Sequence, residues 1–317
     1  MQPHRPLDGL LAVDLTRNLP GPYASRELGR LGARVVRLES PEGDPMRDLA
    51  PEWDAHLNAG KESVCCDLKA DVALGRALLE RADIVLEGFR PGVAERLGVG
   101  PEAAPRAIYC SITGFGHGAR AEQAGHDVNY LGYAGALADT APALPPVQVA
   151  DLAAGAQGAV IEILAALLSG GPRRIVVSMT HGSNRFVAFR RAGASVPQVL
   201  TGGAAYYRIY DTADGRHLTV GALEPHFFRN LTALIGRPEL AARQGDADQE
   251  ALAAELAAVF ATRPLADWLE LFDGEDVCAG PVWTVAEAAA ELGTEIPAAP
   301  APALGEHTEA WRRELGL

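Results

Sequence analysis

Short apolar runs alternate with helical segments through the first half of this 317-residue chain, and this alternation constrains the fold most. The apolar runs are typical of buried strands, and the segments between them have helical periodicity. The predicted strands are 10–15, 33–38, 63–68, 83–87, 107–112 and 174–179, and the main predicted helices are 24–31, 71–81 and 153–168. Strand, turn, helix and strand at this spacing form βαβ units. The sequence therefore predicts an α/β fold whose large, Rossmann-like domain contains a parallel sheet.

The pattern changes after residue 182. Residues 184–203 are irregular and end in a pair of glycines, which is typical of a linker. Two strands at 206–210 and 217–221 then form a predicted hairpin, and helices follow at 225–236, 247–261 and 264–272. We expect a large CoA-binding domain at 1–183, a linker at 184–203, a small α+β domain at 204–283 and a C-terminal segment at 284–317 that returns to the large domain. That segment combines a Pro- and Ala-rich connector with a last helix at 307–315.

The net charge of −13 argues against nucleic acid as a partner, because phosphate neutralisation needs a surplus of cations. The first hundred residues nevertheless contain a local basic set, which consists of Arg34, Arg37, Lys61, Lys69, Arg90 and Arg96. Such a set is compatible with a small polyphosphate ligand, and a solvated surface of mixed charge is the alternative. The first strand–helix turn has Pro20-Gly21-Pro22 in place of the dinucleotide-binding glycine motif, so a Rossmann-type nucleotide cofactor is not expected.

The four cysteines and the apolar runs bear on the compartment. Cys65 and Cys66 are adjacent and have no metal-ligand spacing, so we expect all four to be buried free thiols. No apolar run of the length of a membrane span and no secretory signal pattern is evident. We therefore expect a cytoplasmic protein with no membrane span and no metal site.

Three residues are candidates for proton transfer. His126 lies in the polar loop Gly125-His126-Asp127-Val128-Asn129-Tyr130, and its ordinary pKa suits a general base at neutral pH. Asp151 comes immediately before the apolar helix, where an N-cap is the structural alternative and the helix dipole favours the charged carboxylate. Glu224 precedes Pro225 at a strand–helix junction, where it is either a capping group or a participant in the chemistry. A histidine and a carboxylate on separate elements suit removal of a proton from one face of a carbon and its return on the other.

Several motifs along nearly the whole chain resemble the family III CoA-transferases (CaiB/BaiF superfamily). They include Leu19-Pro20-Gly21-Pro22, Asn58-Ala59-Gly60-Lys61, Asp67-Leu68-Lys69, Phe89-Arg90-Pro91-Gly92-Val93 and Ser111-Ile112-Thr113-Gly114-Phe115-Gly116. The motif around His126, together with Glu224-Pro225 and Phe272-Asp273-Gly274-Glu275, is similar to the α-methylacyl-CoA racemase branch.

The resemblance implies an interlocked homodimer, an acyl-CoA ligand and a site between the large domain of one chain and the small domain of the other. It implies that the CoA nucleotide lies near Arg37 and Arg90, with Lys61 and Tyr130 as further candidates. In the racemase branch His126 and Asp151 match the two acid/base residues. Glu224 matches a residue that helps to organise the histidine.

The implied reaction interconverts the 2R and 2S epimers of a 2-methyl-branched acyl-CoA through a thioester enolate. Backbone amides at 152–154 are candidate donors to the enolate oxygen, and no metal or organic cofactor is required because coenzyme A is part of the substrate. Two alternatives stay open. One is a CoA-transferase in which Asp151 is the nucleophile, and the other is an acyl-CoA-binding homologue without catalysis.

Two departures from the branch pattern affect these expectations. His181 stands where an acidic residue usually precedes Gly182, and the chain is shorter than is usual for this branch at 180–203 and 290–304. Both changes bear on the identity of the acyl group and on the interlocked dimer.

Overall fold

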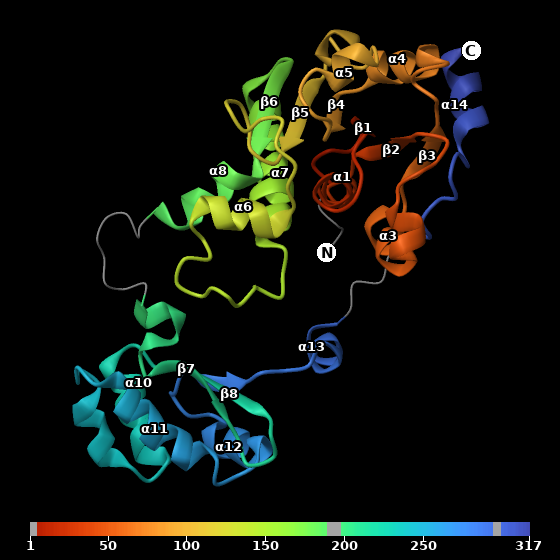
Figure 1. Cartoon of the computed structure of the whole chain (residues 1–317). Coiled ribbons are helices and arrows are strands. Elements are labelled where there is room, and N and C mark those ends of the chain that lie inside the picture. The colour runs from red at the N-terminus through yellow and green to blue at the C-terminus, as the bar shows by residue number, and fades with distance from the viewer. Residues whose placement is uncertain (1–4, 189–197, 294–298) are drawn as a thin grey trace. The chain divides into compact units, whose positions relative to one another are not determined.

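The computed structural model describes residues 5–188, 198–293 and 299–317 (Figure 1). Its contacts divide the chain into two compact units: Met1–Ala188 with Ile296–Leu317 forms the first, and Phe189–Glu295 forms the second. The sequence placed the corresponding boundaries at 183, 203 and 283, so the first unit continues further into the predicted linker.

The first unit is built on a six-stranded sheet in the order β3-β2-β1-β4-β5-β6, in which every neighbouring pair is parallel. The strands are β1 Leu11–Asp14, β2 Arg34–Glu39, β3 Glu62–Cys65, β4 Ile84–Glu87, β5 Ile108–Thr113 and β6 Arg173–Ser178. This order confirms the predicted α/β fold and is that of a doubly wound sheet. Successive strands are added on one side of β1 up to β3 and on its other side from β4 onward, so the strand order reverses between β1 and β4.

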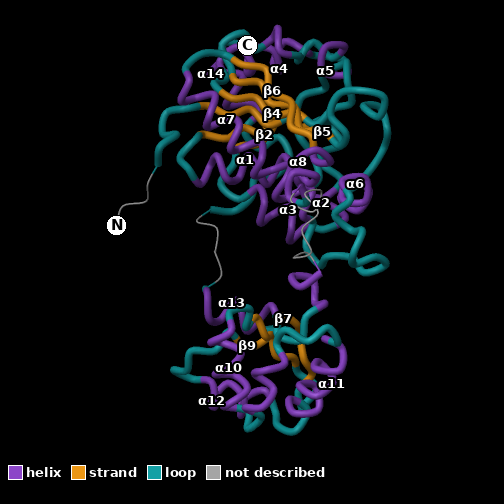
Figure 2. Tube along the Cα trace, turned by 90° about the vertical axis from the view of Figure 1, so that its left-hand side faces the viewer, coloured by secondary structure: helices purple, strands orange, loops and turns teal. Residues whose placement is uncertain are grey.

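Helices cover both faces of this sheet (Figure 2). They are α1 Pro20–Arg30, α2 Met46–Leu49, α3 Pro51–Asn58, α4 Val72–Arg81, α5 Val93–Arg96, α6 Asp127–Ala134, α7 Gly158–Ser169, α8 Met179–Phe186 and α14 Thr308–Leu315, with a 3-10 turn η1 at Pro101–Ala103 and a π-helix η2 at Ala150–Gln157. Alternate side chains of each strand enter two separate cores. Ala12 packs with Leu28 of α1 and Ile163 of α7, whereas Val13 packs with Leu78 of α4 on the other face.

The C-terminal segment covers the edge strand β3 and packs against α4 (Figure 1). The backbone N–H of His307 donates to the Ser63 carbonyl at 2.9 Å, and the Cys65 N–H donates to the Thr308 hydroxyl at 2.9 Å. Trp311 is buried, and its indole N–H donates to Glu62. The segment therefore protects backbone groups that an uncovered edge strand would expose.

Residues 150–169 form one continuous helical stretch, because the π-helix η2 runs directly into α7. By length and composition alone this stretch is apolar enough to cross a membrane, which is weak evidence, since a core helix of a soluble protein passes the same test. The expectation that no apolar stretch reaches this length was therefore wrong. Here the helix packs against β5 and β6 and contributes Ile163 to the core.

The second unit contains a three-stranded antiparallel sheet in the order β7-β8-β9. Its elements are β7 Tyr207–Asp211, β8 His217–Gly221 and β9 Ala279–Pro281, the helices α10 Pro225–Leu234, α11 Gln249–Phe260, α12 Leu265–Phe272 and α13 Val285–Leu292, and the short turns η4 Val199–Gly203 and η5 Pro238–Arg243. The predicted hairpin and the three helices after it are confirmed. A separate core forms around Phe228, Leu256 and Trp268.

Three local expectations were wrong. Residues 184–203 are not uniformly irregular, because α8 continues to Phe186 and η4 begins at Val199; positions 189–197 lie outside the described residues. The polar segment after His126 is helical and forms α6. The four thiols are free, yet Cys278 is exposed and Cys65 is half-buried.

Candidate active site and nucleotide cavity

A cavity of about 400 Å³ lies at the carboxyl ends of the first four strands. Its lining comes from the segments that follow β1 to β4, namely Leu15–Arg17, Leu38–Asp44, Cys66–Lys69 and Phe89, together with Leu97. In doubly wound sheets, ligands bind in the crevice beyond the carboxyl ends of the strands where the strand order reverses. The position and size of this cavity therefore suit the nucleotide part of a ligand.

Two exposed cations, Arg17 and Lys69, line this cavity. Lys69 belongs to the basic set seen in the sequence, whereas Arg17 was missed. The signal that could have found Arg17 is its position, since it follows the carboxyl end of the first strand by three residues. Both side chains are placed to neutralise the charge of phosphate groups.

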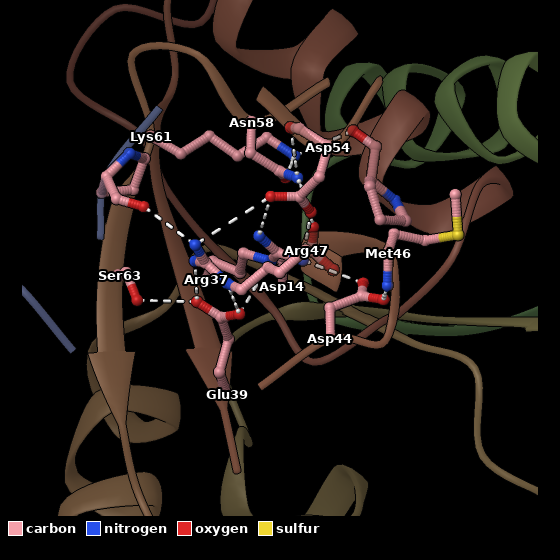
Figure 3. Close-up of polar contacts among 12 residues, drawn as sticks. Asp14, Arg37, Glu39, Asp44, Met46, Arg47, Asp54, Asn58, Lys61 and Ser63 are labelled. Carbon is pink, nitrogen blue, oxygen red and sulfur yellow. Dashed lines mark hydrogen bonds and ion pairs between the residues drawn. The ribbon is translucent and has the colours of Figure 1, made fainter. Parts of the chain in front are cut away.

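Arg37, predicted to bind CoA, is fully buried in the first unit (Figure 3). Its guanidinium donates to Asp44 at 2.8 Å and to Asp54 at 3.0 Å, and its Nε lies 3.5 Å from Glu39. Arg37 is therefore held by carboxylates of the protein, which favours a structural role over contact with a phosphate.

Lys61, a second predicted CoA ligand, is also buried. Its ammonium donates to the Pro22 carbonyl, the Ser25 hydroxyl and the Asn58 side-chain oxygen at 2.7–2.8 Å, which occupies all three N–H groups. Burial lowers the pKa of Lys61 to about 8, an effect that the charge of Asp14 partly offsets. The lysine therefore ties α1 to α3 from inside the first unit.

The two other predicted CoA ligands differ in exposure. Arg90 is exposed just after β4, so it is accessible to a ligand near the cavity. Tyr130 is buried on α6, where its hydroxyl donates to the Gly125 carbonyl. Burial, followed by the charges of Asp151 and Asp127, raises the pKa of Tyr130 to about 12. Its hydroxyl therefore stays protonated and holds the loop before His126.

His126 occupies the N-cap position of α6 and is exposed. Its backbone N–H donates to the Asn129 side-chain oxygen at 3.0 Å, which fixes the start of the helix. Gly125 allows the Tyr130 ring to pack closely, because a Cβ at this position would lie 2.8 Å from that ring. The motif therefore holds the histidine at the end of a helix and leaves its imidazole accessible.

Asp151 lies in the first turn of the π-helix η2 and is half-buried. The structural alternative of an N-cap does not hold, since Val149 takes that position and no side chain caps the helix. The Asp151 backbone N–H donates to the Asp127 carboxylate at 2.9 Å, which joins η2 to the start of α6. Burial, and then the negative charge of Asp127, raises the pKa of Asp151 to about 7.

The structure therefore brings two of the three acid/base candidates onto neighbouring elements. Asp127, which directly follows His126, is hydrogen-bonded to Asp151, so α6 and η2 position the pair together. Glu224 belongs to the second unit, where it is exposed at the N-cap position of α10. None of the three lines the nucleotide cavity.

Two further expectations concern the donors to an enolate oxygen and the absence of a metal site. Of the amides expected to bind an enolate oxygen, that of Leu152 already donates to the Gln148 carbonyl at 2.9 Å. Across residues 5–188, 198–293 and 299–317, no group of three or more His, Cys, Asp or Glu side chains is placed to hold a metal ion.

The sheet order and the cavity at the point where that order reverses define a doubly wound α/β protein. Residues 7–295 match the CoA-transferase family III. The chain belongs to this family.

Relatives with two different reactions are similar to this chain. The alpha-methylacyl-CoA racemase of Homo sapiens is 33% identical, over 98% of this chain and 94% of the human protein. The acetyl-CoA:oxalate CoA-transferase of Acetobacter aceti is 32% identical, over 91% of this chain and 83% of that protein. A crystal structure of a CAIB/BAIF family protein from Brucella suis matches with a TM-score of 0.83 and 30% identity, over 98% of this chain and 99% of that chain. The family therefore includes both racemases and CoA-transferases among the proteins that resemble this one.

Proposed function

We propose that this protein interconverts the 2R and 2S epimers of a 2-methyl-branched acyl-CoA. The observation that carries the proposal is the hydrogen bond from the Asp151 amide to Asp127, since it joins the elements that hold His126 and Asp151. The similarity to the human racemase over nearly the full chain adds support.

The proposed mechanism needs two groups that exchange one proton with the α-carbon from opposite faces. The thioester acidifies that carbon because the enolate delocalises onto oxygen. His126 removes the proton from one epimer, and protonated Asp151 delivers a proton to the other face. A pKa of about 7 supports this role, because acid and base forms of Asp151 then coexist at neutral pH.

The proposed substrate has two ends with different chemistry. The nucleotide end suits the cavity beside Arg17 and Lys69, and the acyl end suits the region around His126 and Asp151. Coenzyme A is part of this substrate, so the reaction as proposed uses no metal or organic cofactor. We expect dialysis against EDTA to leave the exchange rate unchanged.

We also propose an interlocked homodimer in which Glu224 from one chain approaches the histidine of the other. This part of the proposal rests on the resemblance to the racemase branch, together with the position of Glu224 on the second unit. Light scattering after size-exclusion chromatography tests it, and a monomeric mass at micromolar concentration contradicts it.

A CoA-transferase reaction is the second candidate, since relatives with that activity align over most of the chain. The carboxylate of Asp151 would then attack the thioester carbonyl and release the CoA thiolate. Trapping of a covalent Asp151 adduct with hydroxylamine or borohydride would favour this reaction.

The test is proton NMR of (2R)- and (2S)-2-methylacyl-CoA in deuterated water with the protein. We expect deuterium at C2 with loss of stereochemical purity in the wild type, and no loss of stereochemical purity from either epimer in His126→Ala. His56→Ala, which changes an exposed histidine on α3, is the matched control and should retain the activity. Absence of exchange across several acyl chain lengths would rule out racemisation of those substrates.

A further inference from the structure

Two loops that form walls of the nucleotide cavity are joined by one carboxylate. These loops are 15–18, after β1, and 38–46, around the end of β2. The Asp44 Oδ2 atom accepts from the Asn18 backbone N–H at 3.0 Å and from Arg37 at 2.8 Å. Its Oδ1 atom accepts from the Met46 N–H at 3.0 Å. Asp44 is 2% exposed, so these bonds form in a shielded environment.

The backbone of Asn18 shows that this link holds an unfavourable conformation. Asn18 has φ of 67°, in the left-handed region. Asparagine tolerates this region better than most residues, yet the conformation needs support from its surroundings. The hydrogen bond from Asn18 to Asp44 supplies that support, so the shape of the loop after β1 depends on the Asp44 carboxylate.

Arg37 fixes the position of Asp44 through a direct contact between their side chains (Figure 3). Its guanidinium is 0% exposed and bridges Asp44 to Asp54 of α3. Arg47 adds a second bridge, since it donates to Glu39 at 2.7 Å and to the Pro302 carbonyl at 3.1 Å. The two buried lining carboxylates, Asp44 and Glu39, are thus each paired with an arginine, which reduces their repulsion of a phosphate.

We propose that Arg37 and Asp44 act as a clasp that holds the two loop walls of the nucleotide cavity, and that Arg37 is a positioning residue rather than a ligand of CoA. This inference rests on the proposed function for the identity of the ligand. The dependence of both cavity walls on the Arg37–Asp44 pair is independent of the proposed function.

The clasp and a direct role of Arg37 predict opposite effects of removing Asp44. If Arg37 binds a phosphate, loss of Asp44 frees the guanidinium and removes a negative charge from the wall, so CoA should bind more tightly. If the pair is a clasp, loss of Asp44 releases both loops, and CoA should bind more weakly although the cavity has become less acidic.

The experiment measures CoA affinity by titration calorimetry for the wild type, Asp44→Ala, Arg37→Met and the double variant. We expect each single change to raise the Kd on the order of tenfold, and the double change to raise it little further, because both residues act through one contact. In the exchange assay KM should rise with kcat nearly unchanged, because His126 and Asp151 lie on other elements. Arg34→Met is the matched control. Arg34 is the first residue of β2, the strand that also contains Arg37, but its side chain is exposed and is paired with Glu62 and Glu314.

Hydrogen exchange of the ligand-free proteins supplies a second readout. The clasp predicts faster exchange in both 15–18 and 38–46 for Asp44→Ala, and no change in these segments for Arg34→Met. If Arg37→Met does not fold, Asp44→Asn, which removes the charge and retains an acceptor, takes its place in the comparison.

The outcomes separate the two proposals. Tighter or unchanged CoA binding by Asp44→Ala, or unchanged hydrogen exchange in either wall, would overturn the clasp. A wild type that binds no CoA would instead contradict the proposed function, and hydrogen exchange would still decide whether Arg37 and Asp44 hold the walls.

Discussion

The negative charge of Asp127 next to Asp151 leads to a prediction that can be measured without a substrate. Asp127 is half-buried at the start of α6, and its Oδ1 atom accepts from the Asp151 amide. The pKa of Asp151 is raised from 3.8 to about 7, first by burial and second by Asp127. Asp127→Asn removes the charge and retains an oxygen acceptor for the Asp151 amide. The variant therefore measures how much the charge of Asp127 contributes to the raised pKa of Asp151.

The expected magnitude follows from the two causes. A neighbouring charge typically changes a carboxyl pKa by about 1 to 3 units, and we expect the lower end here because burial is the larger cause, which puts the pKa of Asp151 in the variant at about 6. Because the pKa of Asp151 is higher in the folded protein than its ordinary value, the folded state holds the proton more tightly than the unfolded state. The protein therefore loses stability as the pH increases from 3.8 to about 7. Between pH 5 and pH 9 the variant should therefore gain about 1.4 kcal/mol of stability relative to the wild type.

The direct assay is carbon NMR of the aspartate carboxyl groups as a function of pH, with Asp151→Asn used to assign the signal. Urea unfolding at pH 5 and pH 9 supplies the energetic counterpart. If the protein is a racemase, kcat/KM for the epimer that Asp151 deprotonates should rise with pH through about 7, and through about 6 in the variant.

A pKa of Asp151 that stays at about 7 or rises in Asp127→Asn would refute the reasoning, because burial alone would then explain the value. The control is the same Asp127 change in an Asp151→Asn background. There no carboxylate remains at 151, so the change should produce no difference between pH 5 and pH 9 in relative stability.

Three packing predictions are checked by urea unfolding. Trp311→Ala should cost about 3–5 kcal/mol, because it empties a buried site beneath the C-terminal helix; a cost below about 1 kcal/mol would mean that the segment is not part of the core. Gly21→Ala should cost about 1–3 kcal/mol, since the added Cβ would collide with the Thr16 side chain, whereas Gly245→Ala, with nothing near its Cβ, should stay within about 0.5 kcal/mol; equal costs would contradict this. Lys61→Met should cost about 3–5 kcal/mol because it leaves buried acceptors without their cation, and retention of full stability would disprove that role.

The fold was predictable where patterns are local and repeated. Six apolar runs became the six strands of one parallel sheet, because each run is too short for a helix and is bounded by turn residues. The segments missed include α3, α6, α8 and α13, which are eight residues each. Such short helices depend on tertiary contacts more than on their own periodicity, so the sequence contains little signal for them.

The candidate site was easier to predict in residue type than in geometry. The motif and the spacing select His126 and Asp151 as candidates, yet only the structure shows that Asp127 links their elements. The burial of Arg37 and Lys61 was not predictable, because a cation looks the same in a sequence whether it faces a phosphate or a buried carboxylate. Pairing across elements such as β2 and α3 depends on the assembled fold.

The error about Asp151 shows which physical effect determines its chemistry. An aspartate before a helix is expected to be stabilised as an anion by free amides and by the helix dipole, which would lower its pKa. Here the amide of Asp151 donates to Asp127 and that of Leu152 donates to Gln148, so neither is available to the Asp151 carboxylate. The carboxylate therefore experiences burial and a like charge without that compensation, and its pKa rises instead. A π-helix at this point, a form often found at functional sites, thus converts a common capping residue into a carboxyl group that can both accept and donate a proton near pH 7.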